Sequence, residues 1–181
     1  MNVSRRWATG IRISVSFVFL ILSAGWVHGA NWPSWRGPRG DGTTQERLFP
    51  TMWSPEKNIK WSVALPERGN SSPIVWEDRV YLSQAIESEH FRSLMCFDRA
   101  SGDLMWQSGV RYARAESKHE TNTYCASSPV TDGERIYVSY ASAGLYCYDM
   151  DGNELWHRNL GPHQHQWGDG ASPILAEKAA S

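Results

Sequence analysis

The sequence contains few cysteines, and their spacing fits neither a disulfide framework nor a zinc site. Its three cysteines, Cys96, Cys125 and Cys147, are an odd number, so they cannot all pair within one chain. Structural zinc sites usually show paired ligands two to four residues apart, which this spacing does not match. Cys96 and Cys147 occupy equivalent positions of an internal repeat. We therefore expect a buried slot for a small side chain there, not a disulfide.

Several features that would indicate hydrolytic, phosphate-binding or nucleic-acid chemistry are also missing. The sequence has no serine-nucleophile elbow, no phosphate-binding glycine loop and no carboxylate pair spaced for acid–base catalysis. Beyond residue 30, lysine and arginine number 15 against 19 aspartates and glutamates. A nucleic-acid partner would require a basic surface, so this balance argues against one.

The only long apolar run lies near the N-terminus. Arg5, Arg6 and Arg12 give a basic start, residues 13–22 (ISVSFVFLIL) are mostly apolar, and small residues follow up to Ala30. This order is typical of a secretory signal peptide, here residues 1–30. The apolar run is shorter than the roughly 20 residues that cross a bilayer, so after cleavage we expect no stable membrane span and a periplasmic or extracellular protein. The alternative is an uncleaved membrane anchor.

What the sequence does contain is an internal repeat. The segment CFDRASGDLMW (residues 96–106) returns as CYDMDGNELW (147–156), with cysteine, an aromatic residue, aspartate, glycine and tryptophan in the same order. Each copy opens with a small residue followed by Ser-Pro, and the same pattern opens a third copy. These openings are residues 71–75, 127–130 and 171–174.

Each complete copy predicts four short antiparallel strands. Alternating β-branched and aromatic residues bounded by turn formers indicate strands, and the aspartate and glycine of the motif suit a tight hairpin. After the opening segments, the expected strands are 79–83, 94–98 and 104–107 in the first copy and 135–139, 145–149 and 154–158 in the second. Four strands in about 45 to 55 residues are typical of propeller blades. The predicted fold class is therefore all-β, an incomplete β-propeller of four-stranded antiparallel blades.

The repeat also predicts how the chain is divided. After the signal, residues 31–70 form an N-terminal extension with an outer strand near Trp61, which belongs to a blade not otherwise present. Residues 71–181 form the propeller repeats, with blades 71–110 and 127–160 and a partial blade 171–181. Trp61, Trp106 and Trp156 recur at similar spacing, and we expect these flat side chains to fill the seams between blades.

At these residues the chain resembles the pyrroloquinoline-quinone-like (PQQ-like) propeller repeat proteins. Their repeat has a small residue, then aspartate, threonine or serine, glycine and tryptophan, which Cys96, Asp98, Ser101, Gly102 and Trp106 match. The second copy is one residue shorter in the turn. The segment 31–38 (NWPSWRGP) is similar to the N-terminus of exported propellers abundant in planctomycete-type bacteria. The resemblance covers about residues 31–175.

The resemblance implies two functional classes. One comprises quinone-dependent alcohol and sugar dehydrogenases, which hold PQQ and calcium beneath an adjacent cysteine pair that this sequence lacks. The other comprises non-catalytic members, including a lipoprotein that helps insert outer-membrane barrels. We expect an exported, non-catalytic binding or scaffold module without a cofactor, from a longer propeller. The alternative is a PQQ-dependent quinoprotein oxidoreductase, or a fragment of one, that uses PQQ and calcium.

Three loops at equivalent positions of successive repeats form a candidate ligand face. Their candidate residues are Arg68 and Asn70 in the first loop, His119, Asn122 and Tyr124 in the second, and His163, His165, Trp167 and Asp169 in the third. Alternating histidines beside an aspartate could bind a metal. The simpler interpretation is a solvated loop between blades, so no metal is assigned.

An incomplete ring also predicts association. Each end of an open blade array leaves an apolar sheet face uncovered, and solvent-exposed strand edges promote pairing. We therefore expect self-association or a protein partner that supplies the missing blades.

Export provides the first test. Protein recovered outside the cytoplasm should begin near Ala30 or Asn31, because signal peptidase cleaves after small residues. Mass spectrometry of the N-terminal peptide measures this directly. An intact Met1 peptide in that fraction would instead favour a membrane anchor.

Overall fold

Two four-stranded antiparallel sheets make up nearly all the regular structure of the computed structural model, which describes residues 29–47 and 49–176. In both sheets the spatial order of the strands is their order along the chain. The first contains β1 (Ile74–Trp76), β2 (Arg79–Ile86), β3 (Phe91–Asp98) and β4 (Leu104–Arg111). The second contains β5 (Val130–Thr131), β6 (Arg135–Ser139), β7 (Leu145–Asp149) and β8 (Glu154–Arg158). The predicted all-β fold with four-stranded blades is confirmed.

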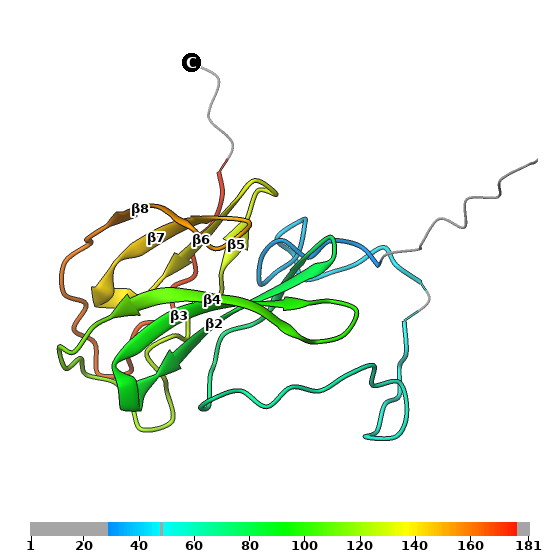
Figure 1. Ribbon diagram of the computed structural model, residues 1–181, viewed down its shortest axis with the longest axis horizontal. Helices are drawn as coiled ribbons and strands as arrows, with labels where there is room; N and C mark the ends of the chain where they lie inside the picture. Colours follow the sequence, from blue (N-terminus) through cyan, green and yellow to red (C-terminus); the bar gives the residue numbers. More distant parts are fainter. Residues whose placement is uncertain (1–28, 48, 177–181) are drawn as a thin grey trace, which may run out of the picture.

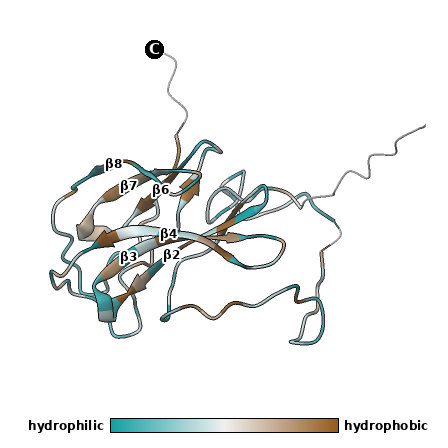
Figure 2. Cartoon of the chain, viewed as in Figure 1, coloured by the Kyte–Doolittle hydropathy of each residue, from teal (hydrophilic) through white to brown (hydrophobic). Residues whose placement is uncertain are grey.

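The sheets lie one against the other, with the hairpin turns β3–β4 and β7–β8 at the same end (Figure 1). Single 3-10 turns, η1 (Glu87–Glu89) and η2 (Ala141–Ala143), connect β2 to β3 and β6 to β7 at the opposite end. Figure 2 shows that β6 and β7 are mostly apolar, whereas the outermost strand β8 is mostly hydrophilic. A polar outer strand suits a sheet edge that faces water.

Two predicted segments fall partly outside the described residues. The predicted signal peptide lies almost entirely on residues 1–28, and the end of the predicted partial blade lies on residues 177–181. The described part of that blade, residues 171–176, contains no strand. Among the described residues, no helix has the length and apolar character needed to cross a membrane.

The repeated motif builds the same three-residue cluster in both sheets. Each cluster places a tyrosine, a cysteine and a tryptophan opposite one another on three adjacent strands: Tyr81, Cys96 and Trp106, and then Tyr137, Cys147 and Trp156. The aromatic rings meet across the cysteine, with centroids 5.9 Å apart in the first cluster and 6.0 Å in the second. Both cysteines are fully buried, because only a small side chain leaves room for the two rings.

The motif's aspartate and glycine close the β3–β4 and β7–β8 hairpins, as predicted. Asp98 accepts hydrogen bonds from the N–H groups of Ser101 (2.7 Å) and Ala100 (2.8 Å), and these lower the pKa of its carboxyl. Gly102 and Gly152 have φ of 82° and 86°, in the left-handed region that glycine occupies without strain.

A tryptophan from the preceding segment packs onto each of these turn glycines. A Cβ added to Gly152 would lie 2.7 Å from the Trp106 ring, and one added to Gly102 would lie 2.7 Å from the Trp61 ring. The Trp61 indole also donates a 3.0 Å hydrogen bond to the Arg99 carbonyl. The outer strand predicted near Trp61 does not form. Trp61 takes the seam position through its ring alone, without joining a sheet.

The serine of each repeat opening links successive repeats. The Ser72 N–H donates to the Ser128 hydroxyl at 2.9 Å, and the Ser128 N–H donates to the Ser172 hydroxyl at 2.9 Å. Although residues 171–176 form no strand, Ser172 therefore occupies the position expected for the start of a third blade.

One face of the second blade is uncovered where the same face of the first is buried. Tyr81 and Leu94 of the first blade are 0% exposed beneath the second blade. Their register equivalents, Tyr137 and Leu145, are only half-buried. Trp106 and Trp156, which we expected at the seams between blades, are both half-buried.

A buried ion pair joins the two blades to the long connection between them. Arg92 of β3 pairs with Glu116, and their side chains are only 3% and 4% exposed. The guanidinium also donates a 2.6 Å hydrogen bond to the Tyr140 carbonyl of the second blade. Glu116 in turn accepts a 2.9 Å hydrogen bond from the Ser142 N–H of η2.

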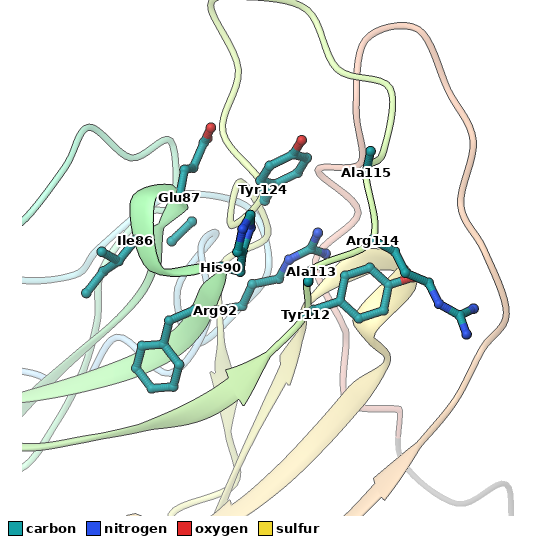
Figure 3. Close-up of a pocket in the computed structure, with 11 residues that line it drawn as sticks. Ile86, Glu87, His90, Arg92, Tyr112, Ala113, Arg114, Ala115 and Tyr124 are labelled. Atoms are coloured by element: carbon teal, nitrogen blue, oxygen red, sulfur yellow. The ribbon is translucent and has the colours of Figure 1, made fainter.

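Two tyrosines flank the same guanidinium. Tyr112 and Tyr124 each place their ring centroid 4.7 Å from the Arg92 guanidinium carbon. Figure 3 shows Arg92 reaching inward between them, whereas Arg114 of the same connection points away. Cation–π contact and a paired carboxylate together compensate for the burial of this charge.

The tryptophan–glycine contact can be tested with Gly152→Ala. A left-handed backbone costs a non-glycine residue roughly 1–2 kcal/mol, and the added methyl collides with Trp106, which adds about 1–3 kcal/mol. Gly161→Ala is the control, because Gly161 has φ of 83° with nothing within 4 Å of the added Cβ. Urea unfolding should show the larger loss for Gly152→Ala. Equal losses would mean that the ring contact contributes nothing.

The buried ion pair can be tested with Glu116→Gln. This change leaves a buried guanidinium without a counter-charge, and we expect a loss of about 3–5 kcal/mol in the free energy of unfolding. The matched control, Glu89→Gln, breaks the exposed Arg111–Glu89 pair and should cost at most about 1 kcal/mol. A Glu116→Gln protein as stable as the control would contradict the structural role of the pair.

Candidate binding face

The three loops that carry the predicted ligand residues lie in contact at one end of the blades. The second and third loops, within residues 112–129 and 159–173, emerge opposite the β3–β4 and β7–β8 turns (Figure 1). Loop ends of a rigid β-scaffold are common locations for binding residues. Whether this face binds a ligand remains a prediction.

The first loop contacts the second through both of its predicted residues. The Arg68 guanidinium donates a hydrogen bond to the Glu120 carbonyl. Asn70 accepts a 3.2 Å hydrogen bond from the Thr123 hydroxyl. Both side chains are therefore engaged within the protein, which leaves them fewer groups to offer a ligand.

The second loop contacts the third through two predicted residues. The Asn122 side-chain amide donates a 2.6 Å hydrogen bond to the Trp167 carbonyl. The His119 and Trp167 rings stack with centroids 5.1 Å apart and planes tilted by 34°. The structure thus brings these residues of two successive loops together.

Tyr124 has a different position from its predicted neighbours. Its ring packs against the Arg92 guanidinium, and its hydroxyl donates a 3.4 Å hydrogen bond to the Glu116 carbonyl. It supports the loop from beneath. The sequence analysis missed Arg92 and Glu116, although a charged residue within the mostly apolar β3 segment is a signal that could have revealed Arg92.

The histidines predicted as possible metal ligands do not converge on a common site. His163 pairs with Asp169 through Nδ1, while His165 Nδ1 accepts a 3.3 Å hydrogen bond from the Trp167 N–H. Asp169 also accepts a 2.9 Å hydrogen bond from the Ala171 N–H. Within residues 29–47 and 49–176, no three histidine, cysteine, aspartate or glutamate side chains gather in a way that could hold a metal ion. The loop geometry explains these residues as turn-stabilising groups.

Two concave regions border this face. One, of about 240 Å³, lies beside Tyr112 and Tyr124 between η1 and the connection after β4 (Figure 3). The other is an open recess of about 410 Å³ lined by Lys118, His119, Glu120, Gln166 and Trp167. The second contains predicted ligand residues from two different loops.

The cysteines offer no reactive thiolate. All three are free and buried, and loss of hydration raises the pKa of Cys96 and of Cys125 to about 12. Burial also raises the pKa of Cys147. A thiol with a raised pKa stays protonated at neutral pH, and the thiolate is the nucleophile. The adjacent cysteine pair of the quinone-dependent dehydrogenases has no counterpart in this sequence.

Comparison with solved structures gives a partial match. The crystal structure of BamB from Moraxella catarrhalis aligns with a TM-score of 0.40 and 20% sequence identity. The match covers 55% of this chain and 26% of the BamB chain, so this chain spans only a small part of that protein's length. No curated protein matches the sequence.

Comparison with protein-family models gives a match over most of the chain. The model described as outer membrane protein assembly factor BamB, built on PQQ-like repeats, matches residues 50–180. This range includes both blades, the loops of the candidate face and the start of the third repeat. The chain therefore belongs to the BamB-type family of PQQ-like repeat proteins.

Proposed function

We propose that this chain is an exported, non-catalytic propeller module that binds or scaffolds another protein through the uncovered face of its second blade. The single observation that carries the proposal is the difference in solvent exposure between equivalent residues of the two blades. Tyr81 and Leu94 are 0% exposed, whereas Tyr137 and Leu145, at the same register positions, are half-buried. Partly exposed aromatic and aliphatic side chains clustered on one sheet face are typical of protein-interaction surfaces.

The contacts between the two blades indicate what this face would bind. Trp106 of the first blade packs on Gly152, and the Ser108 hydroxyl donates a 2.6 Å hydrogen bond to the Gly152 carbonyl. Trp156 is the register equivalent of Trp106, and none of the described glycines packs against it. The complementary surface is a hairpin turn with glycine at positive φ. A further blade of the same repeat type would supply it.

Other properties support a binding role without a cofactor. The thiols are buried and protonated, and the sequence carries no motif for covalent or acid–base catalysis. We propose that the protein acts without PQQ or calcium. The basic and apolar N-terminus supports export. The matching family model carries the name of an outer membrane assembly factor, which supports a location in the periplasm or outside the cell.

Association through the second blade can be measured by sedimentation velocity of the exported chain. We expect concentration-dependent oligomers, and Trp156→Ser should weaken association at least about tenfold, because a central interface tryptophan commonly contributes 2 kcal/mol or more. The control is Trp53→Ser, a 68% exposed tryptophan outside the blades, which should leave association unchanged. Circular dichroism confirms that both variants fold. A monodisperse wild-type monomer that unfolds cooperatively would sink the proposal.

A further inference from the structure

An exposed aromatic platform lies at the junction of the second and third loops. Trp167 is 53% exposed, although large aromatic side chains usually bury most of their area. The His119 ring packs against it with the two centroids 5.1 Å apart and the ring planes tilted by 34°. The recess of about 410 Å³ opens beside the pair.

Hydrogen bonds hold the His119 ring and the backbone of Trp167 in place. The Gly168 N–H donates to the His165 carbonyl at 2.8 Å, which closes a tight turn around Trp167. Asn122 fixes the Trp167 carbonyl from the neighbouring loop at 2.6 Å. His119 Nδ1 lies 2.8 Å from the Thr121 hydroxyl. A half-exposed tryptophan on a fixed backbone segment loses less conformational entropy when a ligand binds than one on a free loop.

The remaining residues of the recess are polar and nearly balanced in charge. Lys118, Glu120 and Gln166 supply an ammonium, a carboxylate and an amide. The Lys118 ammonium lies 3.4 Å from the Glu87 carboxylate and donates a 3.2 Å hydrogen bond to the Asn122 carbonyl. Its charge is therefore compensated within the protein, so the recess offers no concentrated positive charge to an anion.

From this combination we propose that the Trp167–His119 platform binds a neutral saccharide. The C–H groups on one face of a sugar ring carry partial positive charge and pack on the electron-rich face of an indole. Its hydroxyls both donate and accept hydrogen bonds, as the carboxylate and amide of the rim require. The recess volume falls within the range of small-ligand sites, about 300–1,000 Å³.

The inference rests on the proposed binding function but uses a different surface. The platform is formed by the loops, whereas the proposed protein contact uses the sheet face around Trp156. Because only one ring face and one rim make contact, we expect weak binding, with a dissociation constant on the order of 1 mM.

The test is saturation-transfer-difference NMR of the exported chain with cellohexaose, maltohexaose and chitohexaose, and with dextran sulfate as the anionic probe. At least one neutral oligosaccharide should bind saturably and receive magnetisation mainly at C–H protons of its sugar rings. Trp167→Ala should weaken this binding at least tenfold. Gln166→Ala, which removes only a rim amide, should weaken it about threefold and provides a second variant should the first not fold.

Trp53→Ala is the matched control, since Trp53 is exposed and lies outside the recess. It should bind like the wild type. Saturable binding to none of the three neutral probes, binding only to dextran sulfate, or equal binding by Trp167→Ala would overturn the proposal. Trp156→Ser should retain saccharide binding, so failure of the platform and failure of the protein contact give different results.

Discussion

The contact between a tryptophan ring and a turn glycine is the constraint on which the rest of this structure depends. A strand hairpin ends in a glycine with positive φ, and the absence of a side chain there lets the flat ring of the preceding repeat lie on the backbone. Trp61 and Trp106 both do so, although only Trp106 belongs to a strand. The ring contact therefore positions a segment against the next blade even where that segment forms no strand. The cysteine beneath Trp106 follows from the same requirement, because a larger side chain would lift the ring.

A second constraint places the loops. A connection of eighteen or so residues between blades would be free to move without an anchor, and Arg92 with Glu116 supplies one. Burial of this charge is tolerated because the guanidinium has a carboxylate, a carbonyl and two aromatic faces around it. With Glu116 held, the following segment carries His119 and Asn122 against the third loop. The candidate face thus inherits its rigidity from an ion pair that is almost completely buried.

Much of the fold could be predicted from the sequence because its determinants are local and repeated. Hairpin turns depend on Asp98 and Gly102 within five residues of each other, and a second copy of the pattern confirms the interpretation. The segment around Trp61 was wrongly predicted to be a strand. The spacing between Trp61, Trp106 and Trp156 indicates which rings lie at the seams, but it does not indicate which backbone groups form hydrogen bonds in a sheet. Arg92 and Glu116 are 24 residues apart with no repeated counterpart, so no periodicity reveals them. The contact between His119 and Trp167 likewise cannot be predicted from the sequence, because it depends on how the two blades are placed relative to each other.

The two candidate surfaces follow from different parts of the repeat. The uncovered sheet face exists because every repeat presents a tryptophan to the next one, so an array of blades always carries this surface until a neighbour fills it. The Trp167–His119 platform exists because the loops differ between repeats: the motif residues recur, whereas His119 and Trp167 do not occupy equivalent positions. Residues shared by the repeats therefore specify how blades assemble, and residues that depart from the repeat specify what this particular chain can bind. The loops after β4 and β8, where the repeat pattern is lost, carry the residues of the proposed saccharide platform.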